Sequence, residues 1–137
     1  MCAVDTLRIL VVDDHPFMRS VLRSVFERNN AFSIIAVAED FDAAVQAASG
    51  TTPDVVLTDI HMKPVDGVEL TRYFVRRFPG VPVIGFSNTF FNSDIKAMTD
   101  AGAASVISKD IAVADLYRTL LGLKKRPAVS TSNPYPQ

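Results

Sequence analysis

The chain has 137 residues, of which 48% are hydrophobic and 21% are charged, and its formal net charge at pH 7 is −1. This length suits one domain with a single core, and this composition is typical of a globular chain. The nearly neutral charge gives no electrostatic case for direct nucleic-acid binding. No apolar run approaches the roughly 20 residues that a transmembrane helix needs. We therefore expect a cytoplasmic protein that binds neither a membrane nor nucleic acid directly.

Apolar runs and helical patterns alternate along the chain. Five short apolar runs are typical of buried strands, and they lie at 7–12, 32–38, 54–58, 81–86 and 104–108. Segments with apolar residues at three- and four-residue spacing predict five helices, at 16–28, 41–49, 66–78, 92–101 and 110–121. This alternation predicts βαβ units, hence a parallel sheet with helices on both faces.

The residues at the helix ends agree with these assignments. Asp40 directly precedes the second helical segment and Asp66 stands at the start of the third, where an aspartate side chain caps the first turn. Gly50 comes just past the predicted end of the second helix, and Gly102 comes near the end of the fourth. From Lys124 onward the composition changes to basic residues, prolines and serines. We therefore expect one domain over residues 1–123 and a flexible tail over 124–137.

Polar residues follow four of the predicted strands. Asp13 and Asp14 follow the first strand, Asp59 the third, Ser87 the fourth and Lys109 the fifth. Open parallel sheets bind ligands at the carboxyl ends of their strands, so we expect these side chains at one edge. If the first strand starts in the middle of the sheet, it lies beside the third and brings the three acids together.

Three carboxylates at one edge repel one another unless a cation neutralises them. Oxygen ligands without a cluster of cysteine and histidine favour Mg²⁺, with Mn²⁺ as the alternative. Taken singly, Asp13 and Asp14 would also suit helix capping, and Asp59 would suit a turn. Lys109 would be an ordinary surface lysine or a point charge for a phosphoryl group. The position of all three acids at strand ends favours the metal site.

With these residues in this order, the chain resembles the receiver domain of two-component response regulators over roughly residues 6 to 122. The matching pieces are Ile9 to Asp14, the Asp59 strand with Asp66-Gly67 after it, Ser87, and Ala101-Gly102-Ala103 leading to Lys109. The resemblance implies a flavodoxin-like, doubly wound α/β fold. Its five parallel strands would have the order 2-1-3-4-5, with five helices around them.

The resemblance also implies roles for the acids. Asp59 would be the phosphoacceptor, which takes a phosphoryl group from a phosphohistidine on a histidine kinase or a histidine phosphotransfer protein. Asp14 would bind Mg²⁺ directly and Asp13 through water, and the backbone carbonyl of His61 would add another ligand. Such a receiver catalyses only its own phosphorylation and dephosphorylation and is not a metabolic enzyme.

The remaining implied roles concern the response to phosphorylation. Ser87 would bind the phosphoryl oxygens by hydrogen bonds, and Lys109 would pair with them. The resulting shift would change the face formed by the last two helices and the last strand, which would bind a downstream protein. Phe90 and Phe91 follow Ser87 closely. One of them would pack inward, or one would be exposed and contact the partner.

The sequence departs from the family pattern at three positions near the site. The family usually has an aromatic switch residue three positions before the lysine, where this chain has Val106. The usual proline of the loop after the phosphoacceptor comes one position late, as Pro64, with Lys63 in its place. The residue after the hydroxyl is usually small and here is Asn88. We expect altered coupling between Ser87 and the surface, and an altered dephosphorylation rate.

Two other classes of function stay open at this point. A Mg²⁺-dependent phosphatase with an aspartate nucleophile usually has a second acid two positions later, where this chain has His61. A phosphorylation-independent binding module on the same fold need not keep the acids, the hydroxyl and the lysine. A Ser-His-Asp triad is disfavoured because no Gly-x-Ser-x-Gly elbow surrounds Ser87. A labile phosphoryl adduct on the protein would discriminate among these classes.

Overall fold

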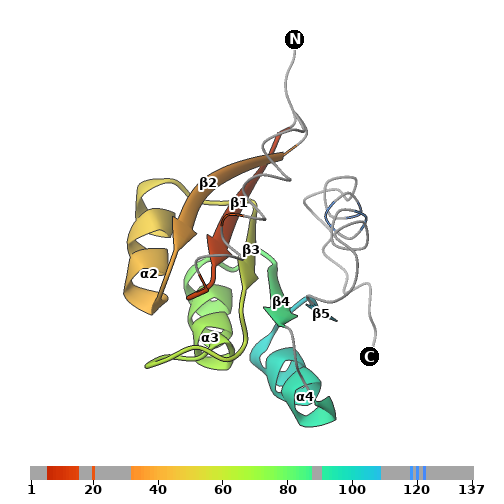
Figure 1. Cartoon of the computed structure of the whole chain (residues 1–137). Coiled ribbons are helices and arrows are strands. Elements are labelled where there is room, and N and C mark those ends of the chain that lie inside the picture. Colours follow the sequence, from red (N-terminus) through yellow and green to blue (C-terminus); the bar gives the residue numbers. More distant parts are fainter. Residues whose placement is uncertain are drawn as a thin grey trace.

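The apolar runs form one five-stranded sheet in which every pair of neighbouring strands is parallel. The computed structural model describes residues 6–15, 20, 32–87, 91–108, 118, 120 and 122. Its strands are β1 (Leu7–Val12), β2 (Phe32–Ala38), β3 (Val55–Thr58), β4 (Val83–Ser87) and β5 (Ser105–Ser108). They lie in the order β2-β1-β3-β4-β5 (Figure 1). The predicted fold class and strand order are confirmed.

Three of the five predicted helices lie among the described residues. They are α2 (Phe41–Gly50), α3 (Gly67–Arg77) and α4 (Asn92–Ala101). The predicted helices at 16–28 and 110–121 lie largely outside the described residues, and the predicted tail at 124–137 lies wholly outside them. The domain boundary therefore stays a prediction. Within the described part of the chain, no helix is both long enough and apolar enough to cross a membrane.

Aspartate caps begin two of the helices, as predicted. The side chain of Asp40 accepts a hydrogen bond of 2.9 Å from the backbone N–H of Ala43. The side chain of Asp66 accepts one of 3.0 Å from the N–H of Glu69. Each bond satisfies a donor that the first helical turn leaves unpaired.

The two glycines near helix ends behave differently. Gly102 has a φ of 110°, the left-handed conformation that ends a helix, and it follows α4. Gly50 was predicted to lie just past α2, and this was wrong: it is the last residue of that helix. Gly50 keeps a conformation open to any residue, and α2 ends at Thr51, whose N–H donates to the Ala47 carbonyl at 3.0 Å.

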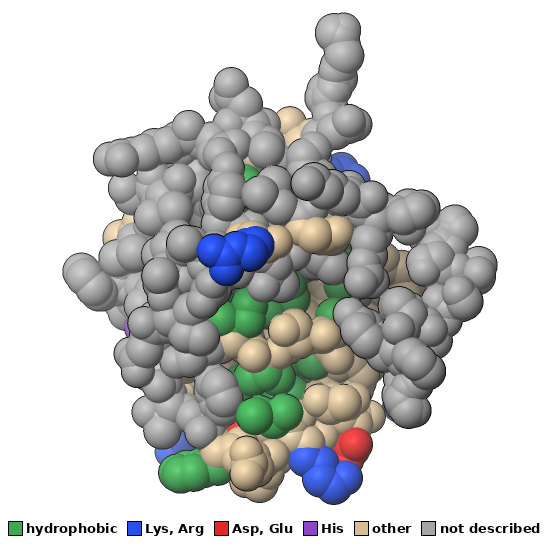
Figure 2. All heavy atoms as spheres, turned by 90° about the vertical axis from the view of Figure 1, so that its right-hand side faces the viewer, with side chains coloured by type: hydrophobic (Ala, Val, Ile, Leu, Met, Phe, Trp, Pro, Cys, Tyr) green, Lys and Arg blue, Asp and Glu red, His purple; other side chains and the backbone are tan. Residues whose placement is uncertain are grey.

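Side chains alternate between the two faces of the sheet and form two cores. One core joins Leu10, Val12 and Val56 to residues of α2 and α3, including the fully buried Phe74. Figure 1 shows these two helices on one face of the sheet. The other core contains Ile9, Val11, Leu57, Ile84, Phe86, Ile107 and Leu120. In the view from the side where β5 lies, hydrophobic side chains gather near the middle of the face shown (Figure 2).

The order of the strands fixes where a ligand can bind. The chain leaves β1 for β2 on one side and returns to β3 on the other side of β1. Val12, the last residue of β1, lies beside Thr58, the last residue of β3. The strand order therefore reverses between the carboxyl ends of β1 and β3, and open α/β sheets bind their ligands at such a point.

Candidate functional site

Backbone hydrogen bonds hold two acids at the ends of the central strands. The N–H of Asp59 donates to the carbonyl of Val12 at 2.8 Å, and the N–H of Asp13 donates to the carbonyl of Ala38 at 3.0 Å. Each acid thus extends the hydrogen bonding of the sheet by one residue beyond its strand. Both are buried, with 3% and 1% exposure. Their positions are therefore set by the sheet rather than by a mobile loop.

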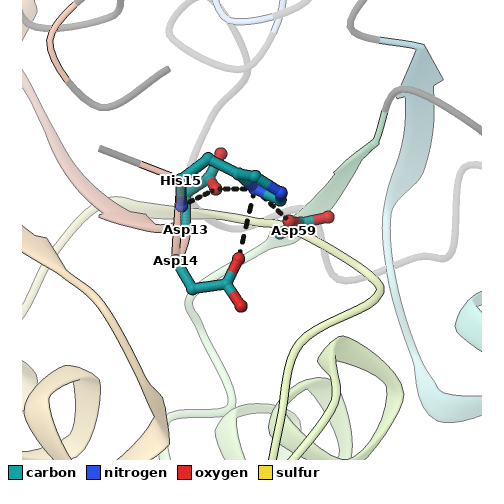
Figure 3. A group of neighbouring side chains, drawn as sticks. All are labelled: Asp13, Asp14, His15 and Asp59. Atoms are coloured by element: carbon teal, nitrogen blue, oxygen red, sulfur yellow. Dashed lines mark hydrogen bonds and ion pairs between the residues drawn. The ribbon is translucent and has the colours of Figure 1, made fainter. Parts of the chain in front are cut away.

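These two acids belong to a cluster with Asp14 and His15. Asp13, Asp14, His15 and Asp59 each offer one ligand atom, and the four atoms lie within 4.8 Å of one another. Figure 3 shows the three carboxylates and the imidazole pointing toward one another. The side chain of Asp14 is partly exposed, so the cluster is open on one side. The expected proximity of the three acids is confirmed.

The imidazole of His15 lies within contact distance of all three carboxylates of the cluster. Its Nδ1 atom is 2.8 Å from Oδ1 of Asp13, 3.1 Å from Oδ1 of Asp14 and 3.3 Å from Oδ2 of Asp59. Sequence reasoning gave His15 no role. The signal was its position directly after two acids at a strand end, but a single histidine does not resemble a metal-binding cluster.

The donors of this cluster fit a divalent cation. Metal–ligand bonds of about 2.1 Å in an octahedron put ligand atoms about 3.0 to 4.2 Å apart, close to the observed spacing. A small movement of the side chains would bring all of them onto one ion. Two of the carboxylates are buried, and buried charges are stable only when paired or bound to a metal. The cluster can therefore hold a metal.

Gly67 lets the loop after β3 fold back onto the phosphoacceptor position predicted at Asp59. The N–H of Gly67 donates to the carbonyl of Ile60 at 2.7 Å. A Cβ atom at position 67 would lie 2.2 Å from the carbonyl oxygen of Asp59 and 2.8 Å from Cα of Ile60. Both neighbours are backbone atoms, so only glycine fits without moving the chain that carries Asp59.

His61 connects the site to α4. Its backbone N–H lies 3.4 Å from Oδ1 of Asp59, and its Nε2 lies 3.3 Å from Oδ2 of Asp94. The same Asp94 oxygen accepts a 2.8 Å hydrogen bond from the N–H of Phe91, at the start of α4. The loop after β3 and the first turn of α4 therefore share one carboxylate. The role of the His61 carbonyl as a metal ligand stays a prediction.

The other predicted site residues lie on the neighbouring strands or outside the described part. Ser87 is the last residue of β4, next to β3, and is 4% exposed. Val106 lies half-buried in β5, opposite Gly85 of β4. Lys109, Asn88 and Phe90 lie outside the described residues. The roles of Ser87 and Lys109 and the effects of Val106 and Asn88 therefore stay predictions.

Known proteins with curated functions match the chain over most of its length. The transcriptional regulatory protein DegU of Brevibacillus brevis is 31% identical over 105 residues, which cover 77% of this chain and 44% of DegU. Protein-glutamate methylesterase/protein-glutamine glutaminase 2 of Methanospirillum hungatei is 36% identical over 112 residues, which cover 80% of this chain and 32% of that protein. The chain thus spans less than half the length of these relatives.

Solved structures match in fold as well. A LuxR-family two-component response regulator from Aurantimonas superposes with a TM-score of 0.81 at 28% identity, over 87% of this chain and 85% of that one. The response regulator domain of Thermotoga maritima CheB superposes with a TM-score of 0.80 at 25% identity, over 89% of this chain and 98% of that domain.

The family model of the response regulator receiver domain matches residues 9–121. The match runs through the ends of β1 and β3, which carry the acidic cluster, and on through β4 and β5. Because it covers most of the chain and agrees with the observed strand order, this chain belongs to the response regulator receiver domains of two-component signalling.

Proposed function

We propose that this receiver domain takes a phosphoryl group onto Asp59 from a histidine kinase or a histidine phosphotransfer protein. The observation that carries the proposal is the placement of Asp59. Its carboxylate is buried at the end of a central strand, and its Oδ2 faces the cluster of Asp13, Asp14 and His15. A nucleophilic carboxylate beside two further acids is suited to phosphoryl transfer assisted by a bound cation.

The chemical step is an in-line displacement at phosphorus. A carboxylate oxygen of Asp59 forms the new P–O bond as the P–N bond of the phosphohistidine breaks, and the leaving imidazole nitrogen takes a proton from water. Such a transfer needs little from the protein beyond position and charge. The bond from the Asp59 N–H to Val12 and the close approach of Gly67 hold the backbone of the nucleophile in place.

Asp13, Asp14 and Asp59 would hold Mg²⁺, with Mn²⁺ as the alternative, and the His61 carbonyl would add a ligand. The ion, when bound, supplies positive charge to the phosphoryl oxygens. Of the chain's own groups, the buried Ser87 at the end of β4 would donate a hydrogen bond to the phosphoryl group. Lys109, just after β5 in the sequence, would supply the second positive charge.

Output would pass through the surface of α4, β5 and the helix predicted after β5. Phe91 and Ile95 are the large hydrophobic side chains that the described residues expose, at 68% and 38%. Phe91 caps the start of α4, and Ile95 lies in the first turn of the same helix. His61 and Asp94 join this turn to the loop after Asp59. A partner protein that covers Phe91 and Ile95 would therefore sense changes at the site.

Intact-mass measurement after incubation with acetyl phosphate and Mg²⁺ tests the proposal. We expect one labile phosphoryl adduct on the unchanged chain and none on Asp59→Asn. Asp54→Asn is the matched control, because Asp54 lies at the opposite end of β3, where it pairs with Arg8 at 3.2 Å. An adduct that persists in Asp59→Asn would contradict the assignment. Multiple turnover of other phosphoesters would indicate a phosphatase, and neither adduct nor turnover would indicate a binding module.

A further inference from the structure

His15 is held inside the acidic cluster by its own backbone. Its N–H donates a 2.8 Å hydrogen bond to Oδ1 of Asp13, two residues earlier. This bond closes a tight turn at the end of β1, as aspartate side chains commonly do. The turn directs the ring toward the same carboxylate, whose Oδ1 lies 2.8 Å from Nδ1. The turn at the end of β1 therefore adds an imidazole nitrogen to the carboxylate oxygens of the cluster.

The distances around Nδ1 match those between ligands of one metal ion. Neighbouring ligands of an octahedral ion with bonds of about 2.1 Å lie about 3.0 Å apart. The Nδ1 atom of His15 lies 2.8, 3.1 and 3.3 Å from oxygens of Asp13, Asp14 and Asp59. These spacings are compatible with a cation that is bound by the three acids and takes the imidazole nitrogen as a further ligand.

We propose that His15 is a ligand of the metal in this receiver domain, through Nδ1, and that it gives the site a mixed nitrogen and oxygen donor set. The inference rests on the proposed function, in which the three acids hold a divalent cation. Mg²⁺ prefers oxygen ligands and retains water, whereas first-row transition metals gain from an imidazole ligand. The site therefore favours an ion such as Co²⁺ or Mn²⁺ over Mg²⁺ more strongly than an all-oxygen site does.

Calorimetric titration of the full chain with MgCl₂ and with CoCl₂ tests this preference. The pH is kept where imidazole is neutral. For His15→Ala we expect the affinity for Co²⁺ to fall by about tenfold or more, since even indirect supports of a metal ligand contribute that much. The affinity for Mg²⁺ should change much less. Asp14→Asn is the comparison variant, and it should weaken the binding of both ions because it replaces a charged carboxylate ligand by a neutral amide.

Nitrogen NMR of the histidine rings supplies a readout independent of affinity. The chain has two histidines, so labelled imidazoles give a simple spectrum in which the signals lost in His15→Ala identify that ring. Titration with diamagnetic Zn²⁺ should shift the Nδ1 resonance of His15. The ring of His61, whose Nε2 lies beside Asp94, serves as an internal reference. A shift confined to His61 would overturn the proposal.

The outcomes separate this inference from the proposed function. If His15→Ala lowers the affinity for both ions equally, or for neither, the nitrogen ligand is refuted while metal binding by the acids stands. If His15→Ala raises the affinity for both ions, the ring occupies the cation's place instead of binding the cation. This result would also refute His15 as a ligand. If the unchanged chain binds neither ion and acetyl phosphate gives no adduct in Mg²⁺, the proposed function itself fails.

Discussion

Replacing Gly67 by alanine should disturb the phosphoacceptor without touching its side chain. Gly67 begins α3, eight residues after Asp59. The added Cβ would lie 2.2 Å from the Asp59 carbonyl oxygen, whereas ordinary contact begins at 3.4 Å. The backbone around Asp59 must therefore move by about 1.2 Å, because no flexible side chain is available to yield.

The expected cost follows from this overlap. Overpacking in a well-packed site typically costs about 1–3 kcal/mol. Two backbone neighbours are too close at once, since Ile60 Cα would lie 2.8 Å from the new Cβ. We therefore expect the upper end, about 3 kcal/mol of unfolding free energy, which for a domain of this size lowers the melting temperature by about 10 °C.

Thermal melts followed by circular dichroism measure this effect, with Gly50→Ala as the matched control. Gly50 ends α2, and a Cβ there would meet nothing within 4 Å. That variant should be stabilised by about 0.4–1 kcal/mol, because alanine restricts the unfolded chain. Phosphorylation of Gly67→Ala by acetyl phosphate should also slow. If both variants melted within about 2 °C of each other, the close packing against Asp59 would be refuted.

Other predictions concern the cluster, the helix cap, the core and the exposed ring. Mg²⁺ at ten times its dissociation constant should stabilise the fold by about 1.4 kcal/mol in thermal melts; an equal gain in Asp14→Asn would contradict the site. Asp66→Ala removes the cap bond to the Glu69 N–H and should lower the free energy of unfolding, measured by urea denaturation, by about 1 kcal/mol; an unchanged midpoint would contradict that role. Phe74→Ala should cost about 3–5 kcal/mol in the same assay, since the ring is fully buried; a loss below about 1 kcal/mol would contradict this. Phe91→Ala should change the free energy of unfolding by no more than about 0.5 kcal/mol, because the ring is 68% exposed; a larger loss of stability would mean that the ring packs inward.

The sequence predicted the strands and the meeting of the acids for a simple physical reason. A buried parallel strand is an unbroken apolar run, so the first polar residue after it marks the carboxyl end. Asp13 and Asp59 follow such runs directly, and they meet once β1 and β3 are neighbours. That neighbourhood does not follow from periodicity, which contains no information on strand order. The order came from the resemblance to receiver domains.

Two features depend on packing that no spacing predicts. Gly50 and Gly102 both come at the end of a helical pattern, but only Gly102 takes a positive φ. Gly102 lies where α4 packs on α3, and a Cβ atom at this position would come within 2.8 Å of a methyl group of Val75 in α3. The direction of the His15 ring was likewise unpredictable, because it depends on the turn that its N–H forms with Asp13.

The central claim is that the phosphoryl group is carried by Asp59. Borohydride reduction of the phosphorylated chain converts an aspartyl phosphate to homoserine, and peptide mass spectrometry then locates the converted residue. We predict homoserine at position 59 alone, formed only when acetyl phosphate and a divalent cation are both present. Homoserine at Asp13 or Asp14, or no conversion in a chain that carries the adduct, would contradict the account.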